Sequence, residues 1–152
     1  MKNTLRRRNR KRMTSAKTGG GPNYFLICTS LLFVTNVFHA LLRGYFVYAF
    51  LFMNLLVTSV VVHYEDTIGT NLVDKCSVFY VFLYGLYMLC RNASVDNWAY
   101  TLIIVSTFLF VVWVYIYGFF NRMFVFDESR GVWYHGLMHA IGSFGHNMIM
   151  LL

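Results

Sequence analysis

Long apolar runs alternate with short polar segments along the whole chain after residue 22. A run of about 20 apolar residues is long enough to cross a bilayer as a helix. The alternating polar–apolar pattern of strands is absent, and uncovered strand edges are not tolerated in lipid. The sequence therefore predicts an all-α membrane protein, a polytopic helical bundle of about five transmembrane helices. The expected spans are Tyr24–Ala40, Gly44–His63, Asn71–Cys90, Trp98–Phe120 and Val132–Leu152.

The polar residues outside these spans define the domain organisation. Residues 1–22 are polar and basic and end in Gly19-Gly20-Gly21-Pro22, so we expect a disordered cytosolic tail. Residues 23–152 then form one transmembrane helical domain. Between the first two spans, the short connection from Leu41 to Gly44 predicts a tight hairpin with Arg43 at its tip.

Composition supports the membrane class and locates the charge. Of the 152 residues, 58% are hydrophobic and 12% are charged, whereas soluble domains carry about 25% charged residues. Eight of the 13 Lys and Arg lie in the first 17 residues, so the net charge of +7 belongs to the tail. The tail lacks the interleaved aromatic residues of single-stranded nucleic-acid binders. We expect it to contact anionic lipid head groups and no nucleic acid. The sequence does not indicate an oligomeric state.

Cys28, Cys76 and Cys90 are an odd count without zinc-type spacing, and all fall in or beside apolar stretches. We interpret them as small apolar core residues.

Basic residues also predict the orientation. With the N-terminus in the cytosol, the cytosolic side holds 11 Lys and Arg and the far side holds two. The sequence Asn92-Ala93-Ser94, a glycosylation acceptor pattern, then lies on the lumenal side. We expect an integral multi-pass protein of the endoplasmic reticulum or another internal membrane.

Four ionisable residues fall in one layer of this arrangement. His63 ends the second span, Asp74 begins the third, and His135 and His139 lie in the first two turns of the last. All four are then near the cytosolic face. Ionisable side chains in a membrane are costly, so they usually pair with one another or serve a function.

The spacing of these residues suits a metal. His135 and His139 are four residues apart, which places two imidazoles on one helix face. With His63, they provide three ligands and leave a fourth position for water, as in a catalytic zinc site. Asp74 is the candidate general base, and later acid, for that water. Ser59, one turn from His63, is the candidate hydrogen-bond donor to the developing oxyanion or the water.

The order S-x-x-x-H, an Asp eleven residues on, and a late H-x-x-x-H resembles the CREST superfamily of membrane hydrolases. That superfamily includes the alkaline ceramidases, the progestin and adipoQ receptors and the Per1-like proteins, and the spacing here is closest to the alkaline ceramidases. The resemblance implies zinc held by His63, His135 and His139, with Asp74 and Ser59 around the water. It also implies a membrane lipid substrate, such as ceramide, cleaved at an amide bond. Members have seven spans, and the pair missing here lies between Asp74 and His135.

Two other classes of function remain open from the residues alone. A haem protein could use His63 with His139, or His39 with His146, as axial ligands. That interpretation leaves Ser59 and Asp74 without a role. A non-enzymatic membrane protein would use its polar residues for packing or to line a pore. We interpret His39 and His146 themselves as packing residues.

Overall fold

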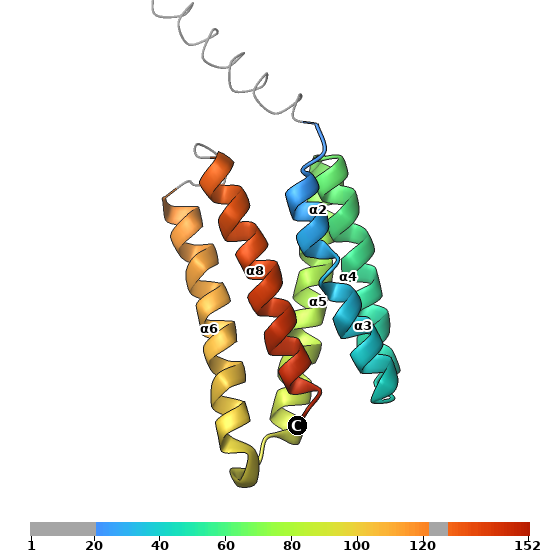
Figure 1. The fold of residues 1–152 in the computed structure, drawn as a ribbon, viewed down its shortest axis with the longest axis vertical. Coiled ribbons are helices and arrows are strands. Elements are labelled where there is room, and N and C mark those ends of the chain that lie inside the picture. The colour runs from blue at the N-terminus through green and yellow to red at the C-terminus, as the bar shows by residue number, and fades with distance from the viewer. Residues whose placement is uncertain (1–20, 122–127) are drawn as a thin grey trace, which may run out of the picture.

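A computed structural model describes residues 21–121 and 128–152 (Figure 1). The predicted tail lies outside these residues, except for Gly21 and Pro22. The elements are α2 (Tyr24–Ser30), α3 (Phe33–Leu42), α4 (Phe46–Tyr64), α5 (Ile68–Asn92), the short 3₁₀ helix η1 (Val95–Asn97), α6 (Trp98–Phe120) and α8 (Glu128–Ile149). The predicted all-α class is confirmed.

Within residues 21–121 and 128–152, four helical stretches are long and apolar enough to cross a membrane. They are Tyr24–Leu42, Phe46–Tyr64, Ile68–Asn92 and Val95–Phe120. The fifth predicted span corresponds to α8, which has 22 residues but is more polar. It carries Asn147 and Ser143 besides its histidines, and both contact α3. Asn36 Nδ2 donates to the Ser143 carbonyl at 2.9 Å, and Asn147 Nδ2 donates to Thr35 Oγ1 at 3.1 Å.

The first predicted span is interrupted at Leu31 and Leu32, between α2 and α3. Thr29 Oγ1 and Ser30 Oγ both donate to the carbonyl of Leu26, at 3.0 and 2.8 Å. Such back-bonding competes with the helical ladder and bends helices. Backbone bonds across the interruption include Leu32 N to Thr29 O at 3.2 Å, the tighter spacing of a 3₁₀ turn. The span is therefore one helical passage with a bend in its middle.

The predicted hairpin after α3 is confirmed and has a defined geometry. Gly44 has a φ of +74°, a left-handed conformation that glycine adopts without a steric penalty. Tyr45 N donates to Ala40 O at 2.8 Å, and Gly44 N donates to Leu41 O at 3.0 Å. These two bonds form a Schellman motif that ends α3 and starts α4.

Among the other spans, the predicted Trp98–Phe120 coincides with α6. The rest differ from their predicted bounds by a few residues. The α5 helix begins at Ile68 instead of Asn71, because Thr67 and Thr70 form a capping box at its start. The α8 helix begins at Glu128, four residues before the predicted Val132. It ends at Ile149, three residues before the predicted Leu152.

The α8 helix occupies the centre of the arrangement. It packs on α6 along one side and on α2 and α3 along the other, with a smaller contact to α5 (Figure 1). The α4 helix packs on α2, α3 and α5. In the view of Figure 1, α2, α5 and α8 begin at the end of the bundle where α4 and α6 finish, and the C-terminus lies at the opposite end.

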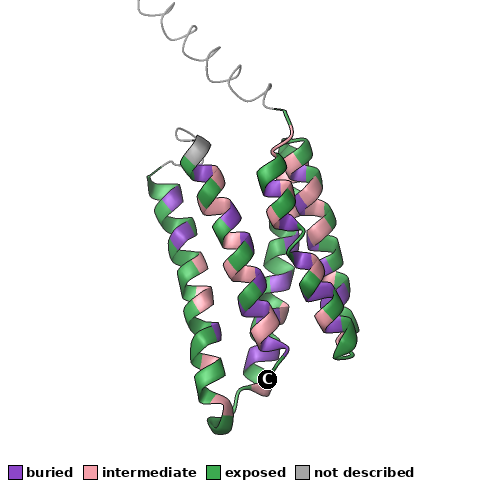
Figure 2. Cartoon of the chain, in the orientation of Figure 1, coloured by how far each residue is buried: buried purple, intermediate pink, exposed green. Residues whose placement is uncertain are grey.

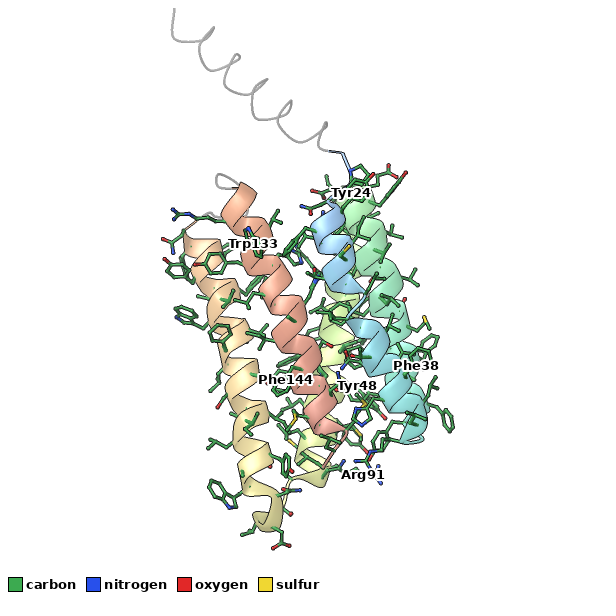
Figure 3. All side chains as sticks on the ribbon, viewed as in Figure 1. Tyr24, Phe38, Tyr48, Arg91, Trp133 and Phe144 are labelled. Atoms are coloured by element: carbon green, nitrogen blue, oxygen red, sulfur yellow. The ribbon has the colours of Figure 1, made fainter. Side chains whose placement is uncertain are left out.

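Many large apolar side chains are exposed on the outer surface of the bundle. The buried residues lie on the helix faces that are turned toward other helices (Figure 2). Phe38 and Phe144, labelled in Figure 3, are 62% and 52% exposed, as expected of side chains that contact lipid. Cys28, Cys76 and Cys90 are also exposed. Their interpretation as core residues is wrong, because an apolar residue of a membrane helix can face lipid as well as the core.

Candidate metal centre

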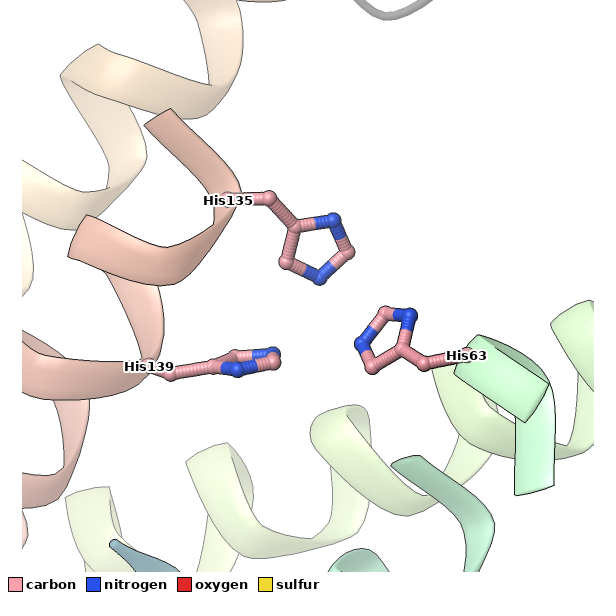
Figure 4. A group of neighbouring side chains, drawn as sticks. All are labelled: His63, His135 and His139. Carbon is pink, nitrogen blue, oxygen red and sulfur yellow. The ribbon is translucent and has the colours of Figure 1, made fainter. Parts of the chain in front are cut away.

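Three imidazoles from two helices converge at one end of the bundle (Figure 4). His63 lies in the last turn of α4, and His135 and His139 lie one turn apart on α8. The centroid of the His63 ring lies 4.9 Å from that of His135 and 5.4 Å from that of His139. The centroids of the two α8 rings are 4.7 Å apart. One potential ligand nitrogen from each ring lies within 4.8 Å of the other two. The three predicted metal ligands are thus brought together.

The geometry fits a tetrahedral ion. At Zn–N distances of roughly 2.0–2.1 Å, two nitrogens of a tetrahedral zinc site are about 3.3 Å apart. Binding would therefore bring the three nitrogens closer by about 1.5 Å or less, a change within the reach of rotation about the histidine side-chain bonds. In addition, His63 Nε2 is buried and has no hydrogen-bond partner. A buried polar atom without a partner is costly, and a metal ion would satisfy it.

Backbone contacts fix the position of His63. Its carbonyl accepts a hydrogen bond from Asn23 N at 2.9 Å, which ties the start of α2 to the end of α4. Asn23 also caps α2, since its Oδ1 accepts from Leu26 N at 3.1 Å. The start of α2 is therefore anchored to the backbone of one of the three histidines.

His139 is held by α2 and α3. Its Nδ1 lies 2.9 Å from Thr29 Oγ1, and its ring packs edge-on against Phe33 with a centroid distance of 5.2 Å. Gly136, one turn earlier, allows this approach. A Cβ at that position would lie 3.0 Å from the Phe25 ring atom Cζ and 3.3 Å from the Thr29 methyl group. The absence of a side chain at Gly136 thus lets α2 approach α8 closely at the site.

The two predicted catalytic residues lie outside the three-histidine group. Ser59 is buried one turn from His63 on α4, and its Oγ lies 3.1 Å from Ser30 Oγ, within hydrogen-bond distance. Asp74 is half-buried on α5, and its Oδ1 accepts from Thr58 Oγ1 at 3.3 Å. Thr58 precedes His63 by five residues, about 7.5 Å along the helix axis at a rise of about 1.5 Å per residue. Both residues therefore lie deeper in the bundle than His63.

The other two histidines considered for metal or haem are engaged elsewhere. His39 Nδ1 lies 3.1 Å from Asn147 Oδ1, across the α3–α8 contact. His146 is buried, hydrogen-bonded through Nδ1 to the Tyr48 hydroxyl, and packed edge-on against Phe52 at 5.2 Å. These contacts agree with their interpretation as packing residues.

Thr29 and Ser30 were missed by the sequence analysis. Each contacts a predicted site residue on another helix, yet a Thr-Ser pair inside an apolar span carries no metal-ligand pattern. The available signal was their depth. They lie one to two turns into the first span, in the layer where the histidines were placed.

Comparison of the chain with protein-family models, with curated proteins and with solved structures finds no match in any of the three. The function is therefore argued from the site itself.

Proposed function

We propose that this protein is a zinc-dependent integral-membrane hydrolase that cleaves the acyl-amide bond of a ceramide-like lipid. One observation carries the proposal. Three imidazoles on two helices converge within 4.8 Å, and one of them has a buried nitrogen without a partner. Packing alone does not require three mutually adjacent imidazoles, whereas three histidines with an open fourth position are a known catalytic zinc set.

The residues around the imidazoles suit hydrolysis. Bound zinc would supply a Lewis acid that activates water and polarises a carbonyl. Asp74 is proposed to accept the proton of the attacking water and to return it to the departing amide nitrogen. Ser59 is proposed to turn its hydroxyl hydrogen toward the carbonyl oxygen as charge develops there. Its Oγ lies 3.1 Å from Ser30 Oγ, which holds the side chain in place.

A lipid substrate agrees with the surroundings of the site. The helices that hold the imidazoles expose apolar side chains on their outer faces, so the acyl chain of a substrate would remain in lipid while its head group reaches the site. The amide bond is taken from the resemblance to the alkaline ceramidases. The basic tail precedes α2, so we propose that the site faces the cytosol, and that the membrane is an internal one.

The haem alternative has less support. A haem held by His63 and His139 would place the macrocycle between their rings, but His135 lies within 5 Å of both. The second pair considered, His39 and His146, is bonded to Asn147 and Tyr48. Three converging imidazoles favour a single compact ion.

The test separates hydrolysis from metal binding. Purified protein is assayed with a fluorescent long-chain N-acyl lipid, and zinc content is measured on the same samples. We expect Asp74→Asn to retain zinc and to lose about 10²–10⁴-fold in rate, because an amide cannot accept the proton. Ser59→Ala should lose less, since one hydrogen-bond donor is removed. Asp96→Asn is the matched control, because Asp96 is exposed in η1.

Two results would contradict the proposal. Asp74→Asn turning over substrate at the parent rate would remove Asp74 from the reaction. A zinc-loaded parent that cleaves neither acyl-amide nor acyl-ester lipids would show that the site binds metal without lipid hydrolase activity.

A further inference from the structure

Two neighbouring hydroxyls on α2 each contact a different part of the proposed site. Thr29 Oγ1 lies 2.9 Å from His139 Nδ1 on α8, and Ser30 Oγ lies 3.1 Å from Ser59 Oγ on α4. Ser30 is fully buried, and Thr29 and His139 are largely removed from solvent. The α2 helix therefore joins the two helices that provide the imidazoles.

The bonds of Thr29 determine which nitrogen of His139 carries the proton. The threonine hydroxyl has one hydrogen, and Thr29 Oγ1 donates it to the Leu26 carbonyl at 3.0 Å. The bond to His139 can exist at the same time only if Thr29 Oγ1 accepts. His139 Nδ1 must then be the protonated nitrogen and Nε2 the one with a free lone pair. A metal ligand needs that lone pair, so His139 would bind through Nε2.

The surrounding packing holds this arrangement in place. Phe33 on α3 lies edge-on to the His139 ring, with a centroid distance of 5.2 Å. Phe25 on α2 packs against Trp133 on α8, with a centroid distance of 4.7 Å. Gly136 leaves room for both Phe25 and the Thr29 methyl group. The break after Ser30 has the same origin, since the bond from Thr29 to Leu26 both bends α2 and orients the hydroxyl oxygen.

We propose that Thr29 is a positioning residue of the metal site, which holds His139 as the Nδ1-protonated tautomer with Nε2 directed to the ion. This inference rests on the proposed zinc site and adds a residue that the metal-ligand pattern does not contain. The second ring nitrogen of a metal-bound histidine is commonly fixed by a hydrogen-bond acceptor, and loss of that partner typically costs about 10–100-fold in metal affinity.

Three variants test the role of Thr29. Thr29→Val keeps the shape and removes the hydroxyl, and Thr29→Ser keeps the hydroxyl. Thr35→Val is the matched control, because Thr35 makes the same two kinds of bond at the neighbouring interface. Its Oγ1 donates to the Leu32 carbonyl at 2.8 Å and accepts from Asn147 on α8 at 3.1 Å. We expect zinc affinity to fall about 10–100-fold in Thr29→Val and to stay near the parent value in the other two.

A second measurement does not depend on metal. In metal-free protein labelled with ¹⁵N-histidine, the nitrogen chemical shifts distinguish a protonated from an unprotonated ring nitrogen. The chain has five histidines, and the His139 signals are assigned by their loss in His139→Ala. We expect Nδ1 to carry the proton in the parent and in Thr29→Ser. In Thr29→Val this preference for Nδ1 should be lost.

The outcomes separate the two proposals. Unchanged zinc affinity in Thr29→Val, with a zinc-binding parent, would overturn the role of Thr29 alone. So would equal weakening in Thr29→Val and Thr35→Val, or an Nε2-protonated His139 in the parent. A parent that binds no zinc would instead overturn the metal site, and an Nδ1-protonated His139 would then reduce the contact to a structural hydrogen bond.

Discussion

At the scale of single residues, the five histidines divide into two kinds by their partners. His39 and His146 have nearby polar side chains, Asn147 and Tyr48, that satisfy one ring nitrogen each. The Nε2 of His63 is buried without such a partner, and its ring lies beside two other imidazoles. Burial alone does not separate ligands from packing residues, since His139 and His146 are equally buried at 7% exposure. A contact at Nδ1 does not separate these two either, since both have one. The neighbouring rings separate them. His139 lies beside two imidazoles, whereas His146 lies beside Tyr48 and Phe52.

This distinction predicts that Tyr48 stabilises the fold without affecting metal binding. Tyr48→Phe would leave His146 Nδ1 without its partner while keeping the ring that packs on Phe52. Hydrogen bonds between membrane helices are worth about 0.6 kcal/mol on average and up to about 1.7 kcal/mol. We expect a loss of that size in the free energy of unfolding in detergent, with zinc affinity unchanged. Tyr80→Phe, on an exposed position of α5, is the control. A drop in zinc affinity would contradict the division.

At the scale of helices, the sequence predicts most element positions and fails where polar contacts act inside an apolar run. Hydropathy defined α6 to the residue, because both its ends border polar segments. It did not predict the break after Ser30, since two hydroxyls hardly change the average of a long apolar span. The break depends instead on the Leu26 carbonyl, which accepts from both side chains.

The faces of the helices are the second feature that the sequence could not supply. In water, an apolar stripe marks the buried side of a helix. In a bilayer both the core and the lipid-facing sides are apolar, so Cys28, Cys76 and Cys90 could not be assigned to either from their chemistry. Polar residues are the exception. The histidines could be placed because depth and i, i+4 spacing restrict them, and these predicted neighbours do meet in the structure.

At the scale of the whole molecule, α8 has the decisive position. It is the most polar long helix, and its histidines, Ser143 and Asn147 face α2, α3 and α4 instead of the surface. Direct packing of α8 on α2 and α3 brings its imidazoles to His63.

This arrangement predicts the topology. Five passages, with α8 as the fifth, would place the ends of the domain on opposite sides, and the C-terminus lies at the far end of the bundle from the start of α2 (Figure 1). We expect an epitope at the N-terminus to be exposed to the cytosol and one at the C-terminus to be protected in sealed vesicles. Protease digestion with and without detergent measures this. Both epitopes on one side would show that α8 does not cross the membrane.

The most direct test of the account is the zinc content of purified protein after dialysis against trace metal. We expect about one zinc per chain, held by His63, His135 and His139. Replacing a ligand should weaken binding beyond the roughly 10–100-fold cost of losing a hydrogen-bond partner around the site, so His135→Ala and His139→Ala should lose most of the metal. His39→Ala, which removes a histidine outside the group, should retain it. Full zinc occupancy in the His135→Ala, His139→Ala double variant, or no zinc in the parent, would contradict the site.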